Sequence, residues 1–109
     1  MSNDLIAANP YALLFQALAA PTRIRILQLL RQEGSMNVSE IERESGLEQT
    51  QISHNLRCLA FCGLVRVARD GKMRVYSINE ETMGPLLRIA DNHLGKYAQA
   101  LYTCDSLER

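Results

Sequence analysis

Hydrophobic and polar positions repeat with helical spacing over the first half of the chain. Apolar residues recur three and four positions apart, prolines stand where two of the segments begin, and glycines follow two of the segments directly. A glycine after a periodic run is a common helix stop. Four helices are predicted: Pro10–Ala19, Pro21 to the "QEGS" run, Val38–Ser45 closed by Gly46, and about Glu48 to Cys62 closed by Gly63.

The spacing then changes to a period of two. The segments "LVRVAR" and "MRVYSI" alternate apolar and polar residues and are joined by Asp70-Gly71-Lys72, which predicts a β-hairpin. Helical spacing returns from about Glu80 to Thr103, and its 3-4 pattern is typical of a helix packed on a partner. The apolar stripe of this last helix is Met83, Leu87, Ala90, Leu94, Tyr97, Leu101 and Cys104.

The order of these elements predicts the fold. A short helix, a glycine turn, a second helix and a hairpin make a helix-turn-helix with a wing. The 109 residues suit one domain over 1–109, mainly α with a small β-hairpin wing.

The distribution of charged residues along the chain is more informative than the net charge. The chain has 12 basic and 12 acidic residues, but Glu48–Tyr76 carries five Lys/Arg against two acids. A local basic surface is what phosphate binding needs. The sequence shows no phosphate-binding glycine loop and no set of nucleophile, base and orienting residue, so we predict no enzyme activity.

The uncharged stretch Leu5–Thr22 is too short and too interrupted to span a bilayer, and we expect a buried first helix there. The N-terminus lacks the basic region and cleavage site of a secretory signal, so we predict a cytoplasmic protein without membrane contact. Its three cysteines are then expected to be reduced.

The fourth predicted helix has two distinct faces when its residues are placed at about 100° each. Ile52, Leu56 and Leu59 share the core face, and small, polar or cationic residues cluster opposite. Such side chains bind base edges and phosphates, although a merely solvated face is the alternative. With the basic hairpin, the candidate DNA-binding residues are Gln49, Thr50, Gln51, Ser53, His54, Arg57, Arg69, Lys72 and Arg74.

Two cysteines lie on a third face of this helix. Cys58 and Cys62 fall at about 240° and 280° from Ile52, off both the core and the DNA side. Thiols four residues apart on a helix fit disulfide geometry poorly, but can hold one metal ion. Thiolates select soft metals. The alternative is a pair of small buried hydrophobic residues.

A third ligand has one cysteine candidate. Cys104 ends the stripe of the last helix, and it reaches the pair on another subunit if that stripe is a dimer interface; otherwise it is a terminal cysteine without a role. Asp91 and His93 form a possible secondary metal site, or an ordinary pair on the helix surface.

The chain resembles the ArsR/SmtB family of metal-responsive winged-helix repressors. The resemblance rests on "LAAPTRIRILQLL", "SGLEQTQISHNLRCL" and "GLVRVARDGKMRVYSI", which match its second helix, helix-turn-helix and wing. It implies a homodimer joined by the first and last helices. Two departures are Glu48, where a small N-cap residue is usual, and Asn55, where histidine is common.

Within that family, "RCLAFCGLV" and a later cysteine resemble the CmtR-type cadmium/lead sensors. The Cys-x-Cys metal motif of other members is absent from "SMNVSEI". The resemblance implies an apo dimer on double-stranded operator DNA that is released when metal binds Cys58, Cys62 and Cys104 of the partner subunit. Cd(II) or Pb(II) is the expected effector, ahead of As(III) or Zn(II). A redox- or persulfide-sensing repressor with the same thiols is the alternative.

Overall fold

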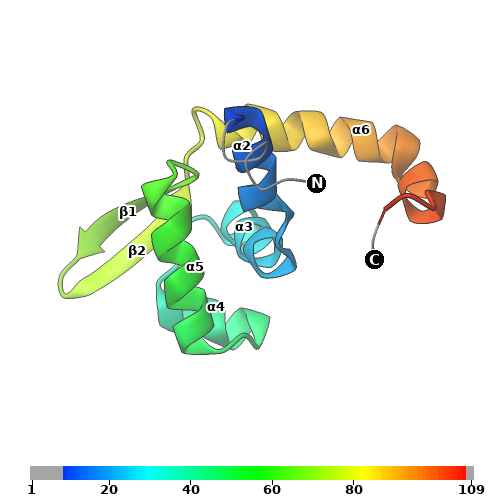
Figure 1. Cartoon of the computed structure of the whole chain (residues 1–109). Coiled ribbons are helices and arrows are strands. Elements are labelled where there is room, and N and C mark those ends of the chain that lie inside the picture. The colour runs from blue at the N-terminus through cyan, green and yellow to red at the C-terminus, as the bar shows by residue number, and fades with distance from the viewer. Residues whose placement is uncertain (1–8, 108–109) are drawn as a thin grey trace. The chain divides into compact units, whose positions relative to one another are not determined.

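The computed structural model describes residues 9–107, and its elements follow the predicted order (Figure 1). They form two compact units, one ending at Asn79 and one beginning at Glu80, and each is considered by itself. The elements are α2 (Pro10–Ala19), α3 (Pro21–Glu33), α4 (Val38–Ser45), α5 (Gln49–Phe61), β1 (Val65–Asp70), β2 (Met73–Ile78) and α6 (Met83–Thr103).

The helix-turn-helix pair α4–α5 is set by local chemistry at its ends. Asn37 and Glu40 form a reciprocal capping box, with the Glu40 amide 2.9 Å from Asn37 Oδ1 and the Asn37 amide 2.9 Å from Glu40 Oε1. Gly46 ends α4 in the left-handed region at φ 73°, which costs glycine little. The chain therefore turns sharply and begins α5 three residues later.

One hydrophobic core holds the first unit together. It is formed by one face each of α3, α4 and α5, closed by the base of the hairpin. Ile52, Leu56 and Leu59 of α5 are 0% exposed, which confirms the predicted core face. Burying each such side chain contributes about 1.5–3 kcal/mol. The remaining buried side chains of this unit are Ile26, Leu27, Leu29, Leu30, Met36, Ile41, Leu64, Val65, Tyr76 and Ile78.

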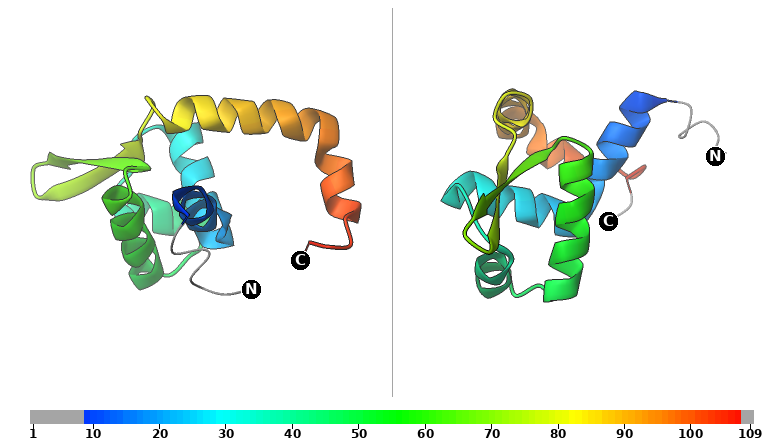
Figure 2. Two further views of the ribbon diagram at one scale, coloured as in Figure 1. Left: turned by 45° about the horizontal axis from the view of Figure 1, so that its top comes forward. Right: turned by 90° about the vertical axis from the view of Figure 1, so that its left-hand side faces the viewer.

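The hairpin extends from the helices as the predicted wing (Figure 2). Its strands are antiparallel, with Val65 opposite Ile78 and Asp70 opposite Met73. Asp70 is therefore part of the strand, and the turn is the pair Gly71-Lys72 rather than the predicted three residues. Gly71 has φ 65°, as the first position of a tight hairpin turn requires. Met36 pairs with Tyr76 through two backbone hydrogen bonds of 2.8 and 2.9 Å, which fixes the wing to the start of α4.

Helix α6 begins three residues later than predicted. Residues 80–82 form a turn, and the helix starts at Met83. Pro85 explains the difference, because proline fits only the first turn of a helix, where the amide needs no partner. A helix starting at Glu80 would have placed Pro85 beyond its first turn.

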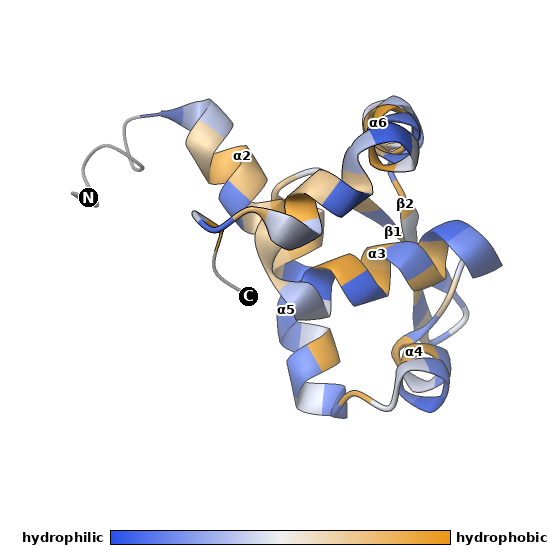
Figure 3. Cartoon of the chain, turned by 90° about the vertical axis from the view of Figure 1, so that its right-hand side faces the viewer, coloured by the Kyte–Doolittle hydropathy of each residue, from blue (hydrophilic) through white to orange (hydrophobic). Residues whose placement is uncertain are grey.

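The expectation of a buried first helix is wrong for the single chain. Helix α2 forms as predicted, and Asn9 caps it by accepting from the Tyr11 amide at 2.9 Å, but none of its residues is buried. Apolar residues lie along the helix (Figure 3), and its large side chains Tyr11, Leu13, Leu14 and Phe15 are exposed. They are kept from water only if another surface covers them. The segment Leu5–Ala8 lies outside the described residues.

A membrane-spanning helix must be both long enough and apolar enough to cross the bilayer. Within residues 9–107, no single helix meets both requirements. Helices α2 and α3 meet them only when counted together, across a bend of 78°.

Candidate nucleic-acid interface and thiol site

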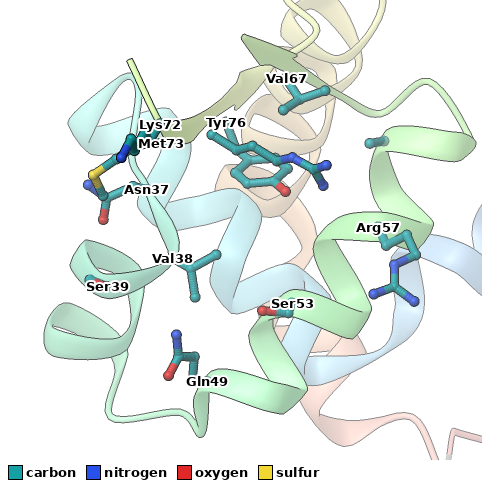
Figure 4. A pocket seen from close by; sticks show the side chains of 12 residues that line it. Asn37, Val38, Ser39, Gln49, Ser53, Arg57, Val67, Lys72, Met73 and Tyr76 are labelled. Atoms are coloured by element: carbon teal, nitrogen blue, oxygen red, sulfur yellow. The ribbon is translucent and has the colours of Figure 1, made fainter. Parts of the chain in front are cut away.

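A hollow of about 500 Å³ lies between α4, α5 and the wing. Five of the predicted DNA-binding residues line it: Gln49, Ser53, Arg57, Lys72 and Arg74. Figure 4 shows Gln49 and Ser53 of α5 across the hollow from Val38 of α4, with the Tyr76 ring above them. The fold thus gathers polar and basic side chains from two separate segments on one open surface.

The wing concentrates positive charge on the side that faces this hollow. Arg69 and Arg74 are direct cross-strand partners. Strand alternation puts them on the same face as Val67 and Tyr76, which line the hollow. Like charges directly opposite each other destabilise a sheet. A phosphate group between the two guanidinium groups would remove that repulsion, so the pair suits an anionic partner.

The other candidates on α5 lie around the hollow. Thr50, Gln51 and His54 are exposed. Gln51 also donates to the Thr22 hydroxyl at 3.3 Å, so its amide is partly engaged with α3. Contact of these residues with DNA stays a prediction.

Among the lining residues that sequence reasoning did not select as DNA-binding candidates, three belong to one segment. They are Asn37, Val38 and Ser39, at the start of α4. The sequence predicts a helix that begins at Val38, but the position of that end beside α5 depends on how the two helices cross.

The thiols of Cys58 and Cys62 lie together at the C-terminal end of α5. Cys58 is half-buried and Cys62 is exposed, so neither is a core residue. Their side chains are within hydrogen-bonding reach of each other. The pair therefore lies outside the buried core of the single chain, and its role as a metal site stays a prediction.

The environment of the pair keeps one thiol protonated. Although Cys62 is exposed, partial desolvation of its thiol raises its pKa, and the charge and hydrogen bond of Cys58 raise it further. The Arg23 guanidinium acts in the opposite direction. A metal ion can displace such a proton because only the thiolate ligates well. Two sulfur donors fit a soft metal but leave its coordination incomplete.

Polar bonds join the same face of α5 to the corner between α2 and α3. Arg23 Nε donates to Asn55 Oδ1 at 2.9 Å, and Arg23 Nη1 donates to the Ala17 carbonyl oxygen at 3.2 Å. Asn55 in turn donates through Nδ2 to the Gln51 carbonyl oxygen at 2.8 Å. Sequence reasoning missed this link, because its two ends are 32 residues apart.

Cys104 lies in the second unit, directly after α6. Its sulfur is 3.3 Å from the Ser106 hydroxyl oxygen. Hydrogen bonds from Ser106, through the hydroxyl and the backbone, lower the pKa of Cys104, and the Leu107 amide adds to this. Cys104 is therefore better prepared to act as a thiolate than an ordinary cysteine.

Asp91 and His93 are both exposed on α6. Residues two apart on a helix do not face each other. The His93 ring instead lies 4.8 Å from the Tyr97 ring, centre to centre. Within residues 9–107 of one chain, no three His, Cys, Asp or Glu side chains are grouped to hold a metal ion.

Comparison with known proteins identifies the family. The bacterial regulatory protein family arsR matches residues 20–67. The NmtR transcriptional regulator of Mycobacterium tuberculosis is 40% identical over 83% of this chain and 74% of its own length. A probable mercury resistance operon repressor of Streptomyces lividans is 36% identical over 83% and 71%. The CmtR regulator of Mycobacterium bovis is 34% identical over 78% and 62%.

Solved structures agree with this. The crystal structure of M. tuberculosis Rv0081 is 33% identical, has a TM-score of 0.73, and the match covers 87% of this chain and 99% of that chain. The homodimeric winged helix-turn-helix domain of Mb0332 from Mycobacterium bovis has a TM-score of 0.64 at 30% identity, covering 86% and 81%. The predicted winged-helix fold is confirmed, and the chain is a transcriptional repressor, not an enzyme, that belongs to the arsR family of bacterial regulatory proteins.

Proposed function

We propose that this repressor senses a soft metal ion through Cys58, Cys62 and Cys104 of the partner subunit. The observation that carries the proposal is the pair of thiols within reach of each other on α5, one half-buried and one exposed, away from both the core and the DNA-binding hollow. In the apo state, α5 and the wing bind the operator in the cytoplasm. Metal binding to the thiols lowers that affinity.

The proposal requires a homodimer, and exposed apolar residues support one. On α2, Tyr11, Leu14 and Phe15 share a helix face and are all exposed, Tyr11 at 75%. On α6, the predicted stripe residues Leu94, Tyr97 and Leu101 are exposed as well. Apolar surface of this extent marks an interaction site. A second copy of the chain that covers both helices would supply Cys104 of the partner subunit as the third ligand.

The donor set favours Cd(II) or Pb(II) as effector, ahead of As(III) or Zn(II). Three thiolates are soft ligands and suit thiophilic ions. One relative is named for mercury resistance, which is the same class of metal. Asp91 and His93 stay a possible secondary site.

A second candidate is a thiol sensor of oxidants or persulfides on the same fold. The lowered pKa of Cys104 favours it, because a more populated thiolate reacts faster. Mass spectrometry after mild oxidation, compared with a metal titration, separates the two functions.

The first experiment is a titration of the reduced protein with Cd(II), Pb(II), As(III) and Zn(II). Thiolate-to-metal absorption in the ultraviolet should rise to an end point of one metal per subunit. Operator affinity measured in parallel should fall with Cd(II) or Pb(II). A protein that binds none of these ions through sulfur, but forms disulfides on mild oxidation, would be the thiol sensor.

The second experiment tests whether the site is shared. A Cys58→Ser/Cys62→Ser chain is mixed with a Cys104→Ser chain, so that each heterodimer holds one complete site and one without thiols. Metal binding should return at about half the wild-type stoichiometry for confirmed heterodimers. A heterodimer without any binding would show that all ligands come from one chain.

A further inference from the structure

Arg23 joins three helices of the first unit through two hydrogen bonds. One nitrogen donates to Asn55 on α5 at 2.9 Å and another to the Ala17 carbonyl oxygen in the last turn of α2 at 3.2 Å. Carbonyls in that turn lack helical donors, and the end of a helix favours a cation. Helix α2 has no basic residue in its own last turn, so Arg23 supplies the cation from α3.

Asn55 is held in one orientation by its partners. Its oxygen accepts from Arg23, and its nitrogen donates to the Gln51 carbonyl oxygen at 2.8 Å. Because the two ends of the amide face a donor and an acceptor, neither contact survives a flip. The amide therefore transfers the position of Arg23 to the backbone of α5 within one helical turn.

The thiol pair belongs to the same stripe of α5. Asn55, Cys58 and Cys62 follow each other at spacings of three and four residues, which places them on one helix face. The positive charge of Arg23 also acts on Cys62, where it lowers the pKa against the larger effects of desolvation and Cys58. The link to α2 and the thiols are thus neighbours on one face, and the DNA-binding hollow lies on another.

We propose that Arg23 is a positioning residue that holds α5 in its DNA-binding orientation and transmits the state of the Cys58–Cys62 pair to it. This rests on the proposed metal-sensing function. In the apo protein, the link fixes the angle of α5 against α2, the helix that the dimer is proposed to use. A metal bound one turn further along the stripe restrains the same helix face. A divalent ion with three thiolate ligands forms a site of net negative charge, which attracts the Arg23 guanidinium away from Asn55. The link to Asn55 is then given up, and α5 leaves its DNA-binding angle.

The forked shape of arginine is essential to this role. Both bonds come from one planar group with nitrogens in fixed directions, whereas a lysine ammonium is a point charge on a flexible stem. Arg23→Lys therefore keeps the charge near the thiols but cannot bridge Ala17 and Asn55 in the same geometry. Arg25→Lys is the matched control, since Arg25 is an exposed arginine of the same helix.

The experiment measures operator affinity with and without Cd(II) for the full-length wild type, Arg23→Lys, Arg25→Lys and Asn55→Ala. Losing one or two hydrogen bonds should lower the apo affinity of Arg23→Lys by roughly fivefold to tenfold. The Cd(II)-bound affinity should not change, so the ratio of apo to metal-bound affinity shrinks by the same factor. Cd(II) stoichiometry and thiolate absorption should match the wild type.

Two further readouts separate positioning from other roles. The slope of log Kd against log salt should stay at the wild-type value, because no phosphate contact is removed. Asn55→Ala should reproduce the effect of Arg23→Lys, and the double variant should add nothing, because both break one link. If Arg23→Lys does not fold, Asn55→Ala tests the same link.

Each outcome decides the proposal. Wild-type affinities with and without metal in Arg23→Lys would overturn it, as would a reduced salt slope or additive effects with Asn55→Ala. If Cd(II) does not release the wild type, the proposed function fails instead. The apo affinity of Arg23→Lys against Arg25→Lys then still decides the link: a drop supports it, and equality overturns it.

Discussion

Two faces of α5 carry different kinds of side chain. The face proposed to bind DNA, called the DNA face, places Gln49, Ser53 and Arg57 at an open hollow shared with the wing. The thiol face carries Asn55, Cys58 and Cys62, of which Asn55 is bonded to α3 and back to its own helix. The first face is arranged for contact with another molecule, and the second is connected to the rest of the unit.

This difference bears on regulation. A ligand on the DNA face would compete with the operator directly, whereas a ligand on the thiol face would have to act by changing the position of the helix. Direct competition needs only that the ligand and the operator overlap in space. Regulation through the helix position needs a ligand that binds one position of α5 more tightly than the other, and such a difference is typically worth about 1–3 kcal/mol. Separate variants on each face should therefore separate DNA binding from metal response.

The largest effect is expected on the DNA face. The Arg57→Ala/Arg74→Ala variant removes one cation from α5 and one from the wing, and should lower operator affinity on the order of a hundredfold. The slope of log Kd against log salt should become shallower by about one for each phosphate group that the variant no longer binds. Fluorescence anisotropy at several salt concentrations measures both, with Lys96→Ala on α6 as the control. Cd(II) binding should be unaffected, and a double variant with wild-type affinity would move the DNA face elsewhere.

The thiol face should show the reverse pattern. Cys58→Ser and Cys62→Ser should each leave apo operator affinity within about twofold of wild type, because neither side chain is in the core or at the hollow. The loss of affinity on adding Cd(II), about 5- to 150-fold for typical allosteric coupling, should disappear. Anisotropy with and without Cd(II) measures this. Metal-induced release that persists in either variant would place the sensor ligands elsewhere.

The two faces also differ in how far the sequence can predict them. Angular spacing predicts the buried face of Ile52 correctly and leaves Cys58 and Cys62 outside the core, because a helix period fixes which side chains share a face. Whether the polar residues of α5 face DNA stays a prediction. It cannot say what lies opposite each face. The bond from Arg23 to Asn55 depends on how α3 crosses α5, which is a property of the packed core.

Other differences between sequence and structure have identifiable reasons. Pro85 delays the start of α6, and Gly71 with its positive φ shortens the hairpin turn to two residues. The sequence predicts a buried α2, whose apolar residues are exposed, because periodicity indicates a face to be buried and not which chain buries it. The thiol pair is predictable from one helix, whereas the proposed third ligand, Cys104 of the partner subunit, depends on the dimer.

A smaller effect is expected from pH. Burial and the neighbouring Cys58 raise the pKa of Cys62, so the thiol is protonated at neutral pH and metal must displace a proton. Apparent Cd(II) affinity should therefore rise with pH, by up to about tenfold per unit for each proton released. The rise should continue above the usual cysteine pKa of 9.0, because the shift is upward.

The DNA face supplies the control for that titration. Guanidinium groups stay charged between about pH 7.5 and 9, a range that lies above the usual titration of histidine. Apo operator affinity should therefore change little over this range. Competition with a chelator of known affinity measures the metal constant at each pH. A Cd(II) affinity that is flat over the same range would show that the thiols are already ionised.

The smallest effect is expected at Cys104, outside both faces. Hydrogen bonds from Ser106 lower the pKa of this thiol, because they stabilise the thiolate. Ser106→Ala removes the hydroxyl 3.3 Å from the sulfur but keeps the backbone contacts. The pKa of Cys104 should rise, and with less thiolate present its alkylation at pH 7.5 should slow by roughly twofold to threefold.

Thr103→Ala is the matched control, since its hydroxyl donates to the Gln99 carbonyl oxygen at 3.1 Å rather than to the sulfur. The rate is followed by mass spectrometry of the Cys104 peptide across pH 6.5 to 9.5, roughly the range in which a cysteine titrates. A midpoint that does not move in Ser106→Ala, or that moves equally in Thr103→Ala, would show that the Ser106 hydroxyl does not prepare this thiol for metal.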